Sequence, residues 1–129
     1  MAAGIPCAWV AADSVYGAAY GVRRWIEDQA LGYVLAVTGA QRFGFGRVAD
    51  RAERIPANDW HRLSAGEGAK GPRSYDWAYV AGGGDAAPGF RRGLLVRRSI
   101  ADPAQVTFYL THAPEGVALA ELVRVAGVR

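Results

Sequence analysis

The sequence is poor in the residues that make covalent cross-links and thiolate metal sites. Cys7 is the only cysteine, so neither an intrachain disulfide nor a zinc site built from thiolates can form. The two histidines, His61 and His112, lie far apart without metal-ligand spacing, and no nucleophile motif accompanies either of them. The sequence therefore excludes disulfide scaffolds and thiolate zinc modules, and it gives no support to covalent catalysis.

Long apolar runs are also missing. No run approaches the roughly 20 residues that a membrane-spanning helix needs, and the N-terminus lacks the positive region of a secretory signal. With 51% hydrophobic and 21% charged residues, the composition is that of an ordinary folded protein. We expect a cytoplasmic chain whose 129 residues form one domain with a modest core, or a piece of a larger protein.

Lysine is nearly absent, and the positive charge comes from arginine. Of the 15 basic residues only Lys70 is a lysine, and arginine is the better fork for phosphate. The net charge of +3 is uneven, because residues 1–40 hold two arginines against three acids. The excess in the remainder is compatible with a polyanionic partner, although many basic proteins have no such partner.

An aspartate closes the first predicted strand. Residues 5–12 are apolar throughout, as in a strand covered on both faces, and Asp13 follows them. Apolar residues then recur at three- and four-residue steps, which predicts a helix from about residue 15 or 16 to residue 30. Residues 33–38 form a second buried strand, so the unit should contain two parallel strands joined by a helix.

Asp13 is the strongest catalytic candidate. An open α/β sheet presents reactive groups at the carboxyl ends of its strands, and a carboxylate at that position is a hard ligand of the kind that Mg²⁺ prefers. An aspartate between a strand and a helix is also a common N-cap, which is the structural alternative.

Beyond Gly39 the sequence changes character. Residues 41–54 are polar and arginine-rich with apolar residues at helical spacing, and Pro56 ends the predicted helix. Residues 58–63 predict a capped turn, and a glycine-rich loop then continues to Pro72.

The last third of the chain predicts an antiparallel meander. Its three strands are linked by short turns, and a return to helical spacing follows them. The predicted strands are residues 73–81, 92–100 and 105–113, and the predicted helix is residues 117–126.

The glycine-rich loop matches a nucleotide-binding motif in sequence but not in its predicted structural context. Gly66-Glu-Gly-Ala-Lys-Gly71 matches the dinucleotide fingerprint, but no strand is predicted before it, and Pro72 and a strand, not a helix, follow. We favour a loop in which Lys70 and Arg73 approach a nucleic-acid phosphate. A flexible turn is the alternative.

Pairs of adjacent arginines are further candidates for phosphate contact. Arg91-Arg92 and Arg97-Arg98 flank the apolar residues 94–96, so one arginine of each pair should leave the sheet on its solvent face. Phosphate contacts through Arg97 and Arg98 would make binding salt-dependent, whereas a solvated edge guarded by charge is the commoner explanation. Arg23 and Arg24 on the first helix have the same two interpretations.

Three blocks of the sequence together resemble the DDE transposases, insertion-sequence enzymes built on a ribonuclease-H-like core. The blocks are Asp13 with Tyr16-Gly17, Leu63–Ala78, and Leu94–Pro103, and they follow the family's order and spacing over essentially the whole chain. The resemblance implies an α/β fold: a partial ribonuclease-H-like strand-helix-strand unit (1–40), a β-rich antiparallel insertion (41–116) and a C-terminal helix that starts the return to the core (117–129).

The resemblance also implies a chemistry. In DDE enzymes two Asp and one Glu hold two Mg²⁺ ions, which activate water and then a DNA 3′ hydroxyl for attack on phosphate. Asp13 matches the second acid, and the other two acids have no counterpart here. A single carboxylate holds Mg²⁺ or Mn²⁺ weakly. We therefore expect a fragment of a DNA transposase that is inactive by itself and whose intact relatives bind transposon ends.

The family's strand order places the strand of the first acid beside the Asp13 strand. Without it an apolar edge would be exposed, which invites self-association. Two alternatives stay open. One is a small non-enzymatic α/β module that binds nucleic acid or protein through its arginine-rich β region, and the other is an enzyme completed by a second chain that carries the missing acids.

Overall fold

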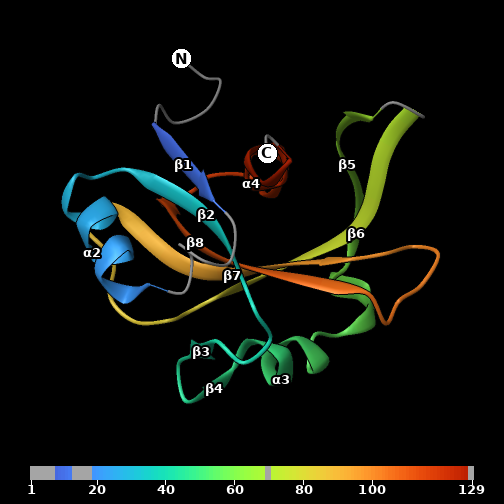
Figure 1. The fold of residues 1–129 in the computed structure, drawn as a ribbon, viewed down its shortest axis with the longest axis horizontal. Helices are drawn as coiled ribbons and strands as arrows, with labels where there is room; N and C mark the ends of the chain where they lie inside the picture. The colour runs from blue at the N-terminus through green and yellow to red at the C-terminus, as the bar shows by residue number, and fades with distance from the viewer. Residues whose placement is uncertain (1–7, 13–18, 69–70, 128–129) are drawn as a thin grey trace.

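The fold is mixed α/β and consists mainly of one sheet (Figure 1). The computed structural model describes the backbone of residues 8–12, 19–68 and 71–127 and, within these, the side chains outside residues 65–73. The described part contains three α-helices and a short 3-10 turn. In chain order the elements are β1 (Trp9–Ala12), α2 (Tyr20–Asp28), β2 (Gly32–Val37), β3 (Arg42–Phe43), β4 (Gly46–Arg47), α3 (Val48–Glu53), the 3-10 turn (Ala57–Asp59), β5 (His61–Gly68), β6 (Gly71–Ala81), β7 (Phe90–Arg98), β8 (Val106–Pro114) and α4 (Leu119–Ala126).

The main sheet has six strands in the order β1-β2-β8-β7-β6-β5. β1 runs parallel to β2, and every other neighbouring pair is antiparallel. The parallel pair and the meander predicted from the sequence are therefore confirmed. Because β2 also pairs with β8, the strand-helix-strand unit and the meander share one continuous sheet.

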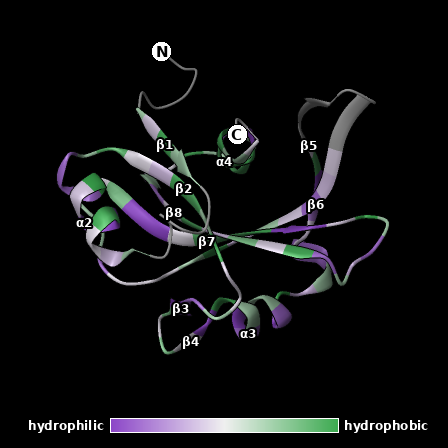
Figure 2. Cartoon of the chain, in the orientation of Figure 1, coloured by the Kyte–Doolittle hydropathy of each residue, from purple (hydrophilic) through white to green (hydrophobic). Residues whose placement is uncertain are grey.

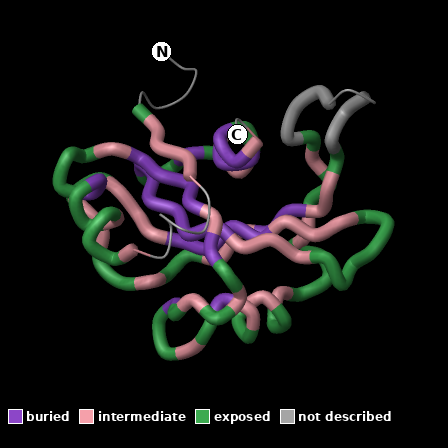
Figure 3. The backbone as a smooth tube through the Cα atoms, in the orientation of Figure 1, coloured by how far each residue is buried: buried purple, intermediate pink, exposed green. Residues whose placement is uncertain are grey.

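The two faces of this sheet bury two apolar clusters. Alternation along β7 sends Leu95 to one face and Leu94 to the other. On the Leu95 side Trp77 and Tyr109 pack under α4, and the Trp77 indole N–H donates to the Leu63 carbonyl at 3.2 Å. Figure 3 shows the buried positions along β2, β8, β7 and α4.

The opposite cluster lies beneath α2 and α3. It contains Ile26 of α2 and Val48 of α3, which pack with Leu94 and Leu35 from the sheet. Each such buried side chain contributes about 1.5–3 kcal/mol of hydrophobic stabilisation. The β3–β4 hairpin is a separate two-stranded sheet, parts of which Figure 2 colours as hydrophilic, but its Phe43 is buried in this cluster.

Helix α2 is shorter than the sequence predicts. Ala19 has an extended backbone (φ −79°, ψ 106°), so the helix begins at Tyr20, and the predicted start near residue 15 lies outside the described residues. At the other end Gln29 caps the helix, and Ala30 takes the left-handed conformation with φ 57°. The helix therefore ends at Asp28, two residues before the predicted end at residue 30, and the chain turns through Ala30 into β2.

Two further predictions were wrong in their details. Within 41–54, the helical spacing that begins at Val48 is confirmed by α3 (Val48–Glu53), but the stretch before it is not a plain polar segment, because Gly44 (φ 64°) turns residues 42–47 into the β3–β4 hairpin. The loop expected up to Pro72 is largely strand, since β5 extends to Gly68 and pairs with β6. In both places pairing with a neighbouring strand decides the conformation, and it overrides the weak local preference of a glycine-rich sequence.

Candidate functional site

A cavity of about 230 Å³ opens between α2, the β3–β4 hairpin and the start of β7. Four arginines and one glutamate line it. The backbone of Gly83 also contributes to its wall. The charged residues are Arg23, Arg24 and Glu27 from α2, Arg42 from β3 and Arg92 from β7. The fold thus brings positive charge to this cavity from three separate elements.

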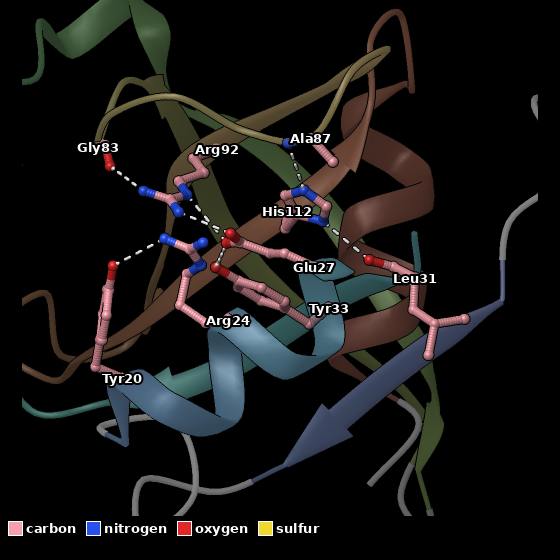
Figure 4. Close-up of polar contacts among 9 residues, drawn as sticks. All are labelled: Tyr20, Arg24, Glu27, Leu31, Tyr33, Gly83, Ala87, Arg92 and His112. Atoms are coloured by element: carbon pink, nitrogen blue, oxygen red, sulfur yellow. Dashed lines mark hydrogen bonds and ion pairs between the residues drawn. The ribbon is translucent and has the colours of Figure 1, made fainter. Parts of the chain in front are cut away.

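Glu27 and Arg92 line the cavity and contact each other (Figure 4). Arg92 Nη2 and Nε donate to Glu27 Oε1 and Oε2 at 2.7 Å and 3.0 Å, which gives a two-point ion pair. The Tyr33 hydroxyl donates to Glu27 Oε2 at 2.8 Å, and Arg92 Nη1 donates to the Gly83 carbonyl at 3.1 Å. The Glu27 side chain is only 7% exposed, so this carboxylate holds Arg92 and is largely shielded from solvent.

The protonation states of this cluster follow from its contacts. Burial raises the pKa of the Glu27 carboxyl, but hydrogen bonds from Arg92 and Tyr33 outweigh burial and leave the pKa below its ordinary value. Burial, followed by the hydrogen bond to Glu27, raises the pKa of the Tyr33 phenol far above its usual range. At neutral pH Glu27 is therefore charged, and the protonated Tyr33 hydroxyl donates a hydrogen bond to it. These fixed protonation states suit the positioning of Arg92 and not general acid–base catalysis.

The other arginines of the cavity lie nearer to solvent. Arg24 is exposed, and its Nη1 donates to the Tyr20 hydroxyl at 3.2 Å. The Arg23 guanidinium lies 5.7 Å from the centre of the Tyr20 ring. Arg42 is exposed on the hairpin. Guanidinium groups that reach solvent above a neutralised ion pair are suited to bind a phosphate, because each can donate two parallel hydrogen bonds to it.

His112 packs against Tyr33, the hydrogen-bond partner of Glu27. Its buried ring stacks on Tyr33 at 5.4 Å and on Phe90 at 4.6 Å between ring centres. Nδ1 lies 2.9 Å from the Leu31 carbonyl, and the Ala87 amide donates to Nε2 at 3.5 Å. These partners assign the neutral tautomer with the proton on Nδ1. Burial lowers the pKa of His112, so the ring stays neutral and links the α2–β2 turn to the loop before β7.

The structure places the six DNA-contact candidates differently. Arg23 and Arg24 meet at the cavity, as described above. Asp13 and Lys70 lie outside the described residues, and Arg73 stands on β6 with its side chain outside the described part. The predicted roles of these three residues therefore remain predictions.

Arg97 and Arg98 lie far from the other pair. Arg97 is five positions beyond Arg92, the cavity residue on the same strand, a distance of about 17 Å at the usual rise of a strand. Arg97 stacks on the Tyr75 ring at 4.5 Å, and its Nη2 donates to Thr107 at 3.0 Å. Arg98 stacks on Trp60 at 3.9 Å. Both side chains are thus held along the sheet surface, apart from the cavity.

Sequence reasoning missed three residues of the cavity. In the sequence Glu27 is only an acid remote from Asp13. It directly follows Ile26, which belongs to the buried stripe of the helix, and an acid next to that stripe is the signal that could have marked it as a partly buried charge. Arg92 stands out only as a member of a pair at a strand end. Arg42 falls in the polar, arginine-rich stretch before the helical spacing, and no hairpin was predicted there.

Metal ligands do not gather in the described part of the chain. No group of three or more His, Cys, Asp or Glu side chains there could hold a metal ion. Nor is any helix within these residues long and apolar enough to cross a membrane. Comparison of the chain with protein-family models, with curated proteins and with solved structures finds no match.

Proposed function

We propose that the chain is a fragment of a DDE transposase with a ribonuclease-H-like core, and that it binds DNA without cutting it. The observation that carries this proposal is the β1–α2–β2 unit. Its strands are parallel, β1 is the outermost of the described strands of the sheet, and β1 ends at Ala12, the residue before Asp13 in the sequence. This is the arrangement that the resemblance implies for the strand of the second catalytic acid.

The proposal assigns no chemistry to the fragment alone. Asp13 is one acid of a three-acid set, and one carboxylate is a weak site for Mg²⁺ or Mn²⁺. In the intact family the metal ions would activate water and a DNA 3′ hydroxyl. The partner is DNA, in the first place transposon ends, and the location that goes with the proposal is the cytoplasm.

The arginine-lined cavity favours a second candidate function. A small non-enzymatic α/β module could bind nucleic acid through Arg23, Arg24 and Arg42, because these guanidinium groups line one site and two of them are exposed. Both candidates predict DNA binding. They differ in what the neighbouring gene sequence encodes.

The genomic sequence around the coding segment separates the two candidates. A transposase origin predicts an Asp on a strand encoded upstream of residue 1, and a Trp followed by a Glu in a helical pattern just after Arg129, in some reading frame. A stop codon and unrelated sequence on both sides would favour the module.

A cleavage assay tests the inactivity. The purified chain, incubated with Mg²⁺ or Mn²⁺ and end-labelled DNA, is expected to leave the DNA intact. Cleavage that is abolished in Asp13→Ala would overturn the inactive assignment and would point to an enzyme that needs fewer acids than the family.

DNA affinity measured against salt tests the contacts. Substitution of both Arg23 and Arg24 by Gln should weaken duplex binding and reduce the salt slope by about 0.9 for each phosphate no longer neutralised. The matched pair Arg97→Gln with Arg98→Gln should change both quantities less, since these side chains do not line the cavity. Equal effects of the two pairs would mean that the cavity is not the main DNA-binding surface.

A further inference from the structure

Phe45 stands at the tip of the β3–β4 hairpin with its whole side chain in water. Its exposed fraction is 105%, against 38–61% for the other exposed large apolar side chains among the described residues. Leaving a phenyl ring in water forgoes about 1.5–3 kcal/mol of burial. The hairpin forms a two-stranded sheet of its own (Figures 1 and 2). Its Phe43 is buried in the core, whereas Phe45 at the turn is left uncovered.

Two hollows flank the hairpin, and both are lined by arginine. The first is the cavity that contains Arg42, and the second, of about 340 Å³, is lined by Arg47, Arg51 and Arg54 together with Asp50. The two hollows adjoin, because both are lined by Phe43 and by the same glycines. Phe45 lines the second hollow, and it follows Gly44, which lines both.

The hairpin ladder places two like charges opposite each other. Arg42 pairs directly with Arg47 across the two strands, and both side chains are exposed. Neither forms an ion pair with any residue in the described part of the chain. Like charges directly opposite on a β-ribbon destabilise it, so an anion bound between them would remove this cost.

The tip also has room for a flat partner. A Cβ atom built on Gly44 or on Gly46 would meet nothing within 4 Å. The space next to both glycines is free and the Phe45 ring itself is fully exposed, so a planar ring could lie against the phenyl face.

We propose that the β3–β4 hairpin binds an unpaired nucleotide of a nucleic-acid strand. The Phe45 ring stacks on the base, and Arg42 and Arg47 hold the phosphates on either side, with Arg51 and Arg54 extending the track. The inference rests on the proposed DNA binding and adds to it the kind of DNA. Stacking needs an exposed base face, which a duplex hides, whereas every unpaired base offers one.

Charge complementarity favours nucleic acid over an apolar protein surface. Phe45 is a fully exposed aromatic ring that shares the lining of its hollow with Arg47, Arg51 and Arg54. One ring with flanking arginines is the pattern of single-strand binding sites, in which aromatic stacking and phosphate contact alternate along the strand.

The experiment compares binding of fluorescent oligothymidylate and of a duplex of the same length by the wild-type chain and by Phe45→Ala. The wild type should prefer the single strand, and Phe45→Ala should weaken that binding about tenfold while leaving duplex binding within about twofold. Phe45→Trp should retain or strengthen it, because a larger ring stacks at least as well. Ile100→Ala, which removes another exposed apolar side chain, is the control and should bind like the wild type.

A second pair of variants tests the phosphate contacts. Arg42→Gln with Arg47→Gln should weaken single-strand binding and reduce its salt slope by about 0.7 for each phosphate no longer neutralised. The thermal stability of this double variant should rise or stay unchanged, since the repulsion across the ladder is gone. A merely structural role for these arginines would lower it.

The possible results separate this inference from the proposed function. Duplex binding without a preference for the single strand, or unchanged binding by Phe45→Ala, would overturn the hairpin proposal and leave the DNA-binding proposal in place. Absence of binding to either DNA would overturn both, while the neighbouring gene sequence would still test the transposase origin. Phe45-dependent binding to anionic lipid vesicles without binding to oligothymidylate would overturn the nucleotide proposal and assign the tip to a membrane surface instead.

Discussion

Glu27 of α2 and Arg92 of β7, 65 residues apart in the sequence, form a two-point ion pair beneath the cavity. The pair joins the helix of the N-terminal unit to the meander across one face of the sheet. Tyr33 donates a further hydrogen bond to the Glu27 carboxylate, and the Gly83 carbonyl accepts one from Arg92. Both charged groups therefore have protein partners in place of the water that burial removes. An ion pair of this kind adds little net stability over a well-packed apolar pair, but removal of one partner is costly.

Replacing Glu27 by Ala should lower the free energy of unfolding by about 2–3 kcal/mol. Arg92 would be left partly buried without its counter-charge, and the cost is moderated because 20% of its side chain remains exposed. Chemical denaturation measures the change. Glu121→Ala, which breaks the exposed pair with Arg124, is the control and should cost no more than about 0.5 kcal/mol. Equal costs for the two variants would show that the Glu27 pair is effectively solvated.

Stability should fall as the pH drops from neutral. The pKa of His112 lies below its ordinary value of 6.5 in the folded chain, so the unfolded chain takes up a proton first and stability is lost below about pH 6.5. The pKa of Glu27 is also lowered, so its contribution is complete above its ordinary 4.5 and is lost as the pH falls through the folded-state value.

Thermal melts at pH 7.5 and 5.5 check the His112 step. His112→Gln removes the titrating group, so the difference between the two melting temperatures should shrink even though the variant is less stable overall. His61→Gln changes an exposed histidine and should keep the wild-type difference. A wild-type melting temperature that is flat over this range would contradict the assignment of a buried neutral His112.

Ala30→Gly should stabilise the chain. Ala30 has φ 57°, a left-handed conformation in which a Cβ atom costs about 1 kcal/mol and which glycine adopts freely. Part of this gain is offset by the greater freedom of glycine in the unfolded chain, so we expect about 0.5 kcal/mol, measured by denaturation. Ala120→Gly, in the exposed first turn of α4, should have the opposite sign. A loss of stability in Ala30→Gly would mean that the alanine methyl group packs favourably in the turn.

The outer edge of β1 should promote self-association. Among the described strands β2 is the only neighbour of β1. Gly32 N–H donates to Ala8 C=O at 2.9 Å. In the parallel ladder the backbone N–H and C=O groups of Val10 and Ala12 therefore point toward β2, and those of Ala11 point to the outer edge. Sedimentation should therefore show concentration-dependent association, which Ala11→Pro reduces by removing an N–H from the open edge.

Ala12→Pro is the matched comparison for that edge. It removes an N–H that faces β2, so it should lower the melting temperature clearly, whereas Ala11→Pro should lower it little. A wild-type chain that stays monomeric at all concentrations would show that the edge does not pair.

Several elements could be predicted because their signals are local. The apolar run of β1, the three- and four-residue spacing of α2 and the turn residues between β6, β7 and β8 each report hydrogen bonding and burial within a few residues. The same locality explains the errors. The hairpin of residues 42–47 and the extension of β5 depend on pairing with another strand, and helical spacing or glycine content does not report such pairing.

The sequence by itself determined the α/β class, the parallel pair of strands, the meander and the near-exclusive use of arginine for positive charge. Only the tertiary structure decided which arginines meet, because their distances depend on the register of a sheet that brings β7 and β2 to the two sides of β8. The pairing of Glu27 with Arg92 and the exposure of Phe45 beside an arginine-lined hollow follow from that packing. Residues so far apart in the chain influence one another only after the sheet has formed, so no local pattern could have shown them together.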